Sequence, residues 1–111
     1  MAKGLGELLT LKGVMASGEF SVDGRLVDFL SHSKVFPQDV AVLTAQFAAA
    51  VTQLFTALAT AHGKISGFNW LPQQAWEYSG GDLTIVVGGN RGVFVKTAEA
   101  DFDQVFAALT E

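Results

Sequence analysis

The chain has 111 residues, a formal net charge of −4 and no cysteine. This length corresponds to one domain over residues 1–111, and half of the residues are apolar, which is enough to form a core. The few Lys and Arg residues are scattered singly, which excludes the basic footprint of a nucleic-acid-binding protein, and the lack of cysteine excludes disulfide scaffolds, thiolate catalysis and Cys-ligated zinc or iron–sulfur sites.

The first predicted element is a short helix. Leu5, Leu8 and Leu9 have the i, i+3, i+4 spacing of one apolar helix face. Gly13 stands where a C-terminal glycine cap is expected, so the helix has about two turns.

The residues from Met1 to Glu7 lack the apolar stretch of a signal peptide. Together with the absence of cysteine, this predicts a cytoplasmic protein.

A β-hairpin is predicted next. Residues Val14 to Phe20 alternate between two sides, as expected of a strand with two different faces. Asp23 and Gly24 are typical of the two central positions of a type I′ turn. Residues 25–30 then form the returning strand, and residues 31–37 break the pattern.

A long helix follows, and from Val40 to Ala61 it has no charged side chain. Pro37 suits its start, and His62-Gly63-Lys64 suits its end. The uncharged stretch corresponds to about 33 Å of helix, which is long enough to cross a bilayer. Its many Ala, Thr and Gln residues provide little driving force for insertion, so we expect no membrane span.

At 100° per residue the helix has two uncharged faces, one bulky and apolar and the other small and weakly polar. One face is bulky and is predicted to pack on the core; it consists of Val40, Leu43, Phe47, Val51, Leu54 and Leu58, with Phe55 at its margin. The other face is small and uncharged, which favours the close approach of a helix from a second subunit; it consists of Val42, Ala45, Gln46, Ala49, Thr52, Gln53, Thr56 and Thr60. The alternative is that this small face is exposed to solvent.

An aromatic stretch separates the helix from three further strands. We expect an extended segment after Ile65 and a strand at about residues 74–79. Large aromatic side chains usually lie in the core, but Phe68, Trp70 and Pro72 are also candidates for a partner-docking patch. Trp76 and Tyr78 are further candidates for the dimer interface.

The remaining pattern predicts two strands and a last helix. A turn at 80–82 is expected before a strand at 83–88, and a turn at 89–92 before a strand at 93–96. The final helix has one apolar face formed by Phe102, Val105, Phe106 and Leu109. The predicted order is helix, two strands, long helix, three strands and helix, which is an α+β pattern.

No group of residues predicts a catalytic, cofactor or metal site. His32 and His62 are far apart in sequence and have no ligand partners at metal-binding spacing. The glycines at 80–81 and 88–92 lack the context of a P-loop or a dinucleotide fingerprint, which favours tight turns. Several other polar residues have no assignable role in chemistry: Ser17, Ser33, Ser79, Asp101 and Asp103.

Four strings resemble the roadblock/LC7 superfamily, and more narrowly a bacterial group of roadblock-like proteins of unknown function. They are Gly13 to Phe20, Asp23 to Asp28, Ser79 to Asp82 and Gly92 to Phe102. The resemblance implies a roadblock/profilin-like fold, in which an antiparallel five-stranded sheet carries the long helix on one face. It also implies a homodimer with adjacent long helices and joined sheets. The implied role is that of a scaffold or regulator, and in some relatives the regulated protein is a small Ras-like GTPase.

Two functions therefore remain open. The first is a non-enzymatic homodimeric interaction module whose further partner is another protein, including a small Ras-like GTPase or a larger assembly. The second is a small-molecule sensing or carrier domain with a profilin-like or PAS-like sheet, in which the aromatic stretch lines a pocket. A dimer without an apolar cavity would support the first function. A monomer with a cavity beside Trp70 or Trp76 would favour the second.

Overall fold

The structure is a computed structural model that describes residues 4–32 and 36–110. Its elements follow the predicted order: α1 (Leu5–Leu8), β1 (Val14–Phe20), β2 (Leu26–Ser31), α2 (Gln38–Ser66), β3 (Ala75–Ser79), β4 (Leu83–Gly88), β5 (Arg91–Lys96) and α3 (Phe102–Thr110). The described residues do not include the middle of the predicted break at 31–37, with Ser33, or residues 1–3 of the N-terminal segment.

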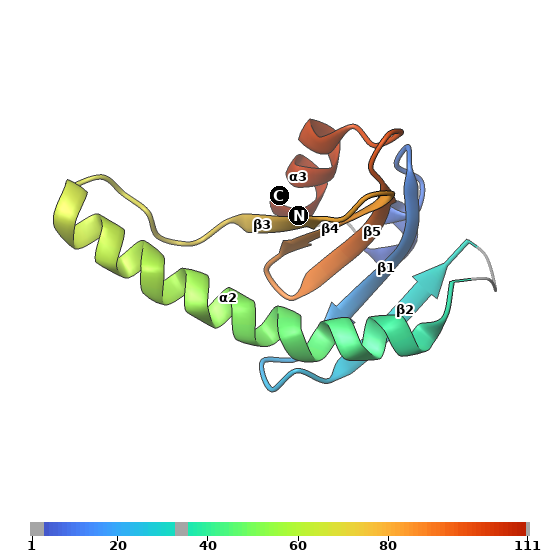
Figure 1. Ribbon diagram of the computed structural model, residues 1–111, viewed down its shortest axis with the longest axis horizontal. Coiled ribbons are helices and arrows are strands. Elements are labelled where there is room, and N and C mark those ends of the chain that lie inside the picture. Colours follow the sequence, from blue (N-terminus) through green and yellow to red (C-terminus); the bar gives the residue numbers. More distant parts are fainter. Residues whose placement is uncertain (1–3, 33–35, 111) are drawn as a thin grey trace.

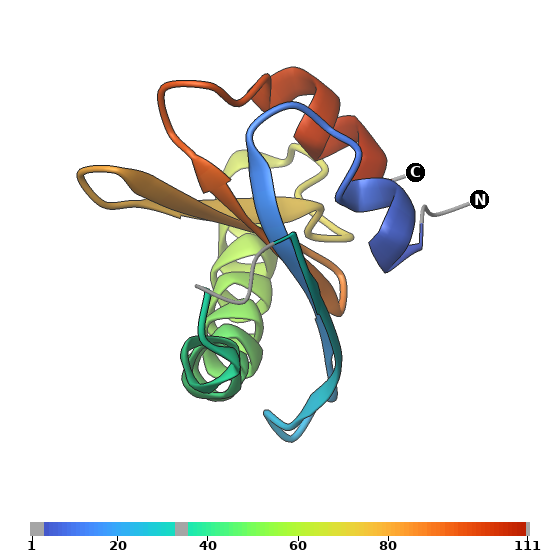
Figure 2. The same ribbon diagram turned by 90° about the vertical axis from the view of Figure 1, so that its right-hand side faces the viewer.

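The five strands form one antiparallel sheet in the order β2-β1-β5-β4-β3. The predicted α+β class and five-stranded antiparallel sheet are confirmed. α2 lies on one face of this sheet, and α1 and α3 lie on the other (Figures 1 and 2). β2 and β3 are the two edge strands, so each has one side without a strand neighbour in the described chain.

The face covered by α1 and α3 holds the larger core. Neighbouring strands contribute Val86, Val93 and Val95, which pack against α1 and α3. Val105 and Leu109 of α3 are buried there as predicted, whereas Phe106 is 46% exposed. Ala108, and not Phe106, is the third α3 residue buried in this core. The prediction that Phe106 packs in the core is therefore wrong.

The face covered by α2 shows that the predicted orientation of this helix is wrong. The helix residues buried against the sheet are alanines: Ala41, Ala45, Ala48 and Ala49. Ala45 and Ala49, which we predicted in the dimer interface, are 3% and 7% exposed. Most of the predicted core stripe is instead exposed: Val40, Leu43, Phe47, Leu54 and Leu58, with Val51 intermediate.

Side-chain volume explains the reversal. The strands present large side chains to α2, including Phe20, Val87 and Phe94. When the sheet fills the space between the layers, the helix must contribute small residues to reach close packing. The alanines therefore face the sheet, and the large side chains of α2 point away from it.

The β1–β2 hairpin is confirmed, but its turn is not type I′. Among the described residues only glycines have positive φ, so Asp23 lacks the conformation that a type I′ turn requires. The Gly24 amide donates to the Ser21 carbonyl, and the Ser21 amide donates to the Arg25 carbonyl. With φ of 87° at Gly24, this geometry matches a type I turn followed by a bulge.

The predicted C-terminal ends of α1 and α2 are also wrong. α1 is a single turn that ends at Leu8, and Gly13 belongs to the tight turn before β1. α2 continues through Gly63 to Ser66 and ends at Gly67, whose φ is 74°. A glycine inside a helix costs only about 1 kcal/mol relative to alanine, so the chain uses the second glycine as its cap.

Gly13→Ala should lower the free energy of unfolding by about 2–3 kcal/mol. Gly13 has φ of +83°, and an added Cβ would lie 2.8 Å from the backbone nitrogen of Ala100. Gly6→Ala is the matched control, because its added Cβ meets nothing within 4 Å. Urea denaturation measures both variants, and equal midpoints would contradict a special requirement for glycine at position 13.

Candidate functional site

The main candidate site is the exposed apolar stripe of α2. Leu43, Phe47 and Leu54 are 57%, 63% and 68% exposed, although each side chain is large and apolar. At 100° per residue these three positions lie within about 40° of one another, on the side opposite the buried alanines. Along the stripe, successive positions are alternately three and four residues apart: Val40, Leu43, Phe47, Ala50 and Leu54. This spacing is typical of a helix–helix seam.

The stripe borders an apolar groove between α2 and β3. The groove has a volume of about 480 Å³, and its walls include Leu43, Phe47, Val51, Phe55, Trp76 and Tyr78. Tyr78 is 66% exposed, whereas Trp76 is half-buried against α2. Trp76 and Tyr78, both predicted interface residues, therefore lie at one groove with the bulky stripe of α2. The free edge of β3 runs beside them.

The predicted small face of α2 is divided by this arrangement. Thr52 is half-buried, and its hydroxyl accepts a hydrogen bond of 2.9 Å from the Trp76 indole nitrogen. The members of the face that remain exposed are Val42, Gln46, Gln53, Thr56 and Thr60. These five lie on one flank of the helix, whereas Ala45, Ala49 and Thr52 belong to its contact with the sheet.

Thr52→Val should lower the free energy of unfolding by about 1–2 kcal/mol. The substitution keeps the shape of the side chain but leaves the half-buried Trp76 N–H without its acceptor. Thr60→Val is the control, because the Thr60 hydroxyl is exposed and donates only to the Thr56 carbonyl of its own helix. Urea denaturation should separate the two variants, and an equal loss in both would contradict this role of the Thr52 hydroxyl.

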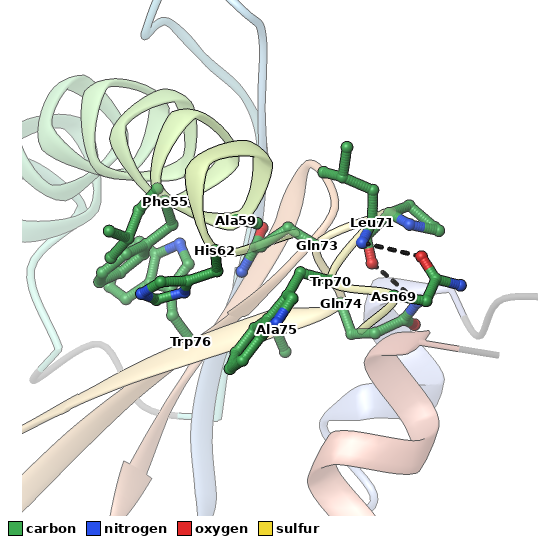
Figure 3. Close-up of a pocket in the computed structure, with 12 residues that line it drawn as sticks. Phe55, Ala59, His62, Asn69, Trp70, Leu71, Gln73, Gln74, Ala75 and Trp76 are labelled. Carbon is green, nitrogen blue, oxygen red and sulfur yellow. Dashed lines mark hydrogen bonds between the residues drawn. The ribbon is translucent and has the colours of Figure 1, made fainter. Parts of the chain in front are cut away.

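The C-terminal half of α2 extends beyond the sheet, and the chain returns along it toward β3 (Figure 1). A second cavity of about 520 Å³ opens between this part of α2 and the returning residues 69–76. Figure 3 shows the Trp70 ring on the returning segment and the rings of Phe55, His62 and Trp76 near the helix. The cavity lies beside both tryptophans of the chain, so one of the two features expected of the alternative small-molecule sensing or carrier domain is present.

The three predicted docking residues lie on the returning segment. Phe68 is 74% exposed, Trp70 is 46% exposed, and Pro72 is exposed. The Trp70 indole nitrogen donates to the Ser66 hydroxyl at 3.0 Å, and its ring packs on His62. The contact between His62 and Trp70 could not be predicted from the sequence, because it depends on the chain reversal at Gly67.

The titratable groups form no metal-binding cluster in the part of the chain that the structure describes. No three His, Asp or Glu side chains come together within residues 4–32 and 36–110. The Ser21 hydroxyl and the Arg25 guanidinium hold the pKa of Asp23 below its usual range, but this carboxylate is exposed in the β1–β2 turn. The buried Arg91 guanidinium donates to the Leu109 carbonyl at 3.1 Å and so caps α3.

Among the described residues, α2 is the one helix that is long and apolar enough to cross a membrane, judged by length and composition alone. Core helices of soluble proteins meet the same criteria when their apolar residues are buried inside the protein. Here the alanine side of α2 packs on the sheet, but only 22% of the most apolar 18-residue stretch of the helix is buried. The remaining apolar surface is the stripe defined above.

Comparisons with known proteins agree with this architecture. A family model described as an uncharacterized conserved protein (DUF2173) matches residues 4–111. No curated protein matches the chain.

Three solved structures have the same fold. A roadblock/LC7 domain from Streptomyces avermitilis is 13% identical, with a TM-score of 0.68 over 95% of this chain and 84% of that one. The gliding protein MglB from Thermus thermophilus is 15% identical, with a TM-score of 0.69 over 96% and 82%. A structure of MglB with a tetrameric arrangement is 17% identical, with a TM-score of 0.70 over 94% and 75%. The chain therefore has the roadblock/LC7 fold and belongs to the DUF2173 family of uncharacterized conserved proteins.

Proposed function

We propose that the protein is a non-enzymatic, cytoplasmic homodimer that serves as a scaffold or regulatory protein-interaction module. The observation that supports this most strongly is the exposed stripe of α2, in which Leu43, Phe47 and Leu54 face away from the sheet. Several large apolar side chains exposed side by side on a single chain are typical of a protein–protein interface. We therefore propose that the dimer interface is the bulky face of α2, and not the small face predicted from the sequence.

The occupant of the stripe is proposed to be a second copy of the same helix. The stripe is self-complementary, because the small Ala50 lies between the large Phe47 and Leu54 and provides space for a large side chain of the partner helix. A two-fold arrangement also requires the same patch on both subunits. The stripe has no charged residue, so burial against a copy of itself leaves no charge unpaired.

The free edge of β3 supports a joined sheet in the same dimer. β3 has β4 on one side and no strand neighbour on the other within the described chain, and Tyr78 lies exposed at this edge. An edge strand is a template for pairing with another strand. Because the groove beside α2 is bordered by β3, one partner could cover the stripe and extend the sheet at the same time.

We further propose that the dimer binds a partner protein, and that this partner is a small Ras-like GTPase. This proposal rests on the superfamily resemblance and on the fold shared with the gliding protein MglB. The small Ras-like GTPases of the source cell can be purified and loaded with GTP or GDP. Binding of one of them in one nucleotide state would support the proposal, and no binding to any would overturn it.

Self-association is tested with two differently tagged copies expressed together. The proposed dimer predicts that purification through one tag retains the other copy, and that Leu54→Glu abolishes the retention. Gln46→Glu adds the same charge to an exposed position beside the stripe and should leave the retention unchanged. Failure of the wild-type copies to purify together would overturn the dimer.

A further inference from the structure

The cavity between α2 and the returning segment shares Phe55 and Trp76 with the groove of the proposed dimer, but its remaining walls are its own. Its walls come from one chain, from α2 between Phe55 and His62 and from residues 69–76. Its volume of about 520 Å³ lies within the range of small-molecule sites. The cavity thus exists in the single chain and does not depend on dimerisation.

The walls of the cavity are flat and aromatic. His62 and Trp70 have ring centroids 4.5 Å apart, and Phe55 and Trp76 have centroids 6.0 Å apart. Figure 3 shows these two ring pairs at the cavity, with Trp70 on the returning segment. Flat apolar walls match the faces of a flat ring, because offset or edge-to-face ring contacts add to the gain from burial.

Both indole rings are held in place by hydrogen bonds. The Trp70 nitrogen donates to Ser66 at 3.0 Å, and the Trp76 nitrogen donates to Thr52 at 2.9 Å. These contacts fix the ring orientations before any ligand arrives, which lowers the entropy lost on binding. They also occupy the indole N–H groups, so the rings present their faces and not their donors.

Two polar side chains at the cavity, His62 and Gln73, are free to bind a ligand. No Asp, Glu, Lys or Arg lines the cavity, so a charged ligand would lose hydration without gaining a counter-ion. The side chains of His62 and Gln73 are half-buried, and neither makes a hydrogen bond to another described residue. Together they offer both donors and acceptors. Figure 3 shows the Gln73 side chain on the helix side of the returning segment.

We propose that this cavity binds a flat, uncharged heteroaromatic molecule. The ring of the ligand packs on Trp70 and Trp76, and its ring nitrogens bond to the Gln73 amide and the His62 imidazole. Aromatic walls can also bind quaternary ammonium cations. The two unpaired polar groups favour the heterocycle, because an ammonium group without N–H would leave both of them desolvated and unbonded.

The test uses the protein's own two tryptophans, which both line the cavity and so give two indole N–H resonances that report directly on it. Indazole, which is flat and neutral and has one N–H donor and one nitrogen acceptor, should shift both resonances with a dissociation constant on the order of 1 mM. Indazole-3-carboxylate has the same ring with a charge and should bind at least about tenfold more weakly. The absence of saturable shifts with indazole, equal binding of the carboxylate, or tighter binding of tetramethylammonium would each overturn the proposal.

Variants separate the cavity from non-specific contact. Trp70→Ala should weaken indazole binding about tenfold, as read from the Trp76 resonance, whereas Trp70→Phe keeps a flat wall and should stay within about threefold. Gln73→Leu removes only the amide and should also weaken binding about tenfold. Phe106→Ala is the control, because Phe106 is an exposed aromatic residue on α3, on the other face of the sheet. Equal loss in Phe106→Ala and Trp70→Ala would contradict the proposed site.

Discussion

Leu54→Glu is expected to convert the dimer into a folded monomer. Leu54 is 68% exposed on the single chain, so the glutamate can stay hydrated in the monomer. In the proposed dimer the same carboxylate would be buried against apolar side chains of the partner. Such burial costs several kcal/mol, which corresponds to at least about a hundredfold weaker association.

Sedimentation velocity measures this change. Gln46→Glu is the matched control, because it adds the same charge to an exposed position of α2 outside the stripe. The control should sediment like the wild type, and Leu54→Glu should sediment as a single chain. The helical circular dichroism of both variants should match the wild type. A Leu54→Glu protein that sediments like the wild-type dimer would show that the stripe is not the interface.

Ala49→Glu is expected to unfold the protein. Ala49 is 7% exposed and packs with Phe20 and Val87 between α2 and the sheet. A glutamate there has neither space nor a charge partner, so the free energy of unfolding should fall by about 3–5 kcal/mol.

Urea denaturation and circular dichroism test this second result. Gln46→Glu is again the control, and its free energy of unfolding should stay within about 0.5 kcal/mol of the wild-type value. The orientation predicted from the sequence gives the opposite pattern, since there Ala49 faces the partner subunit. A folded, monomeric Ala49→Glu protein would restore that orientation and contradict the packing described above.

The sheet could be predicted from the sequence because its strands have local signals. β1 at Val14–Phe20 and β4 at Leu83–Gly88 were predicted to the residue. Each begins after a glycine turn and consists of β-forming residues, so alternation and turn chemistry agree. β5 begins at Arg91, earlier than predicted, because the Gly89-Asn90 turn needs only two residues.

The orientation of α2 could not be predicted in the same way. Amphipathic patterns distinguish an apolar face from a polar one, but both faces of this helix are apolar or uncharged. The choice between them depends on the volume supplied by Phe20, Val87 and Phe94 from strands far along the chain. The signal present in the sequence was the run of alanines at positions 41, 45, 48 and 49, which is itself a helical stripe.

The aromatic cavity was only half predictable. Trp70 was identified as a candidate contact residue from composition, and the structure places it at the cavity. The contribution of His62 required knowing that α2 continues through Gly63 and that the chain reverses at Gly67. A helix ending at residues 62–64, as predicted, would have separated His62 from Trp70.

The molar mass of the wild-type protein in solution tests the central claim most directly. Light scattering across low micromolar concentrations should give about twice the 11.8 kDa of one chain, because the stripe of Leu43, Phe47 and Leu54 is covered by a second copy. A mass of 11.8 kDa at every concentration would mean that the stripe stays exposed to water. That result would contradict the proposed homodimer.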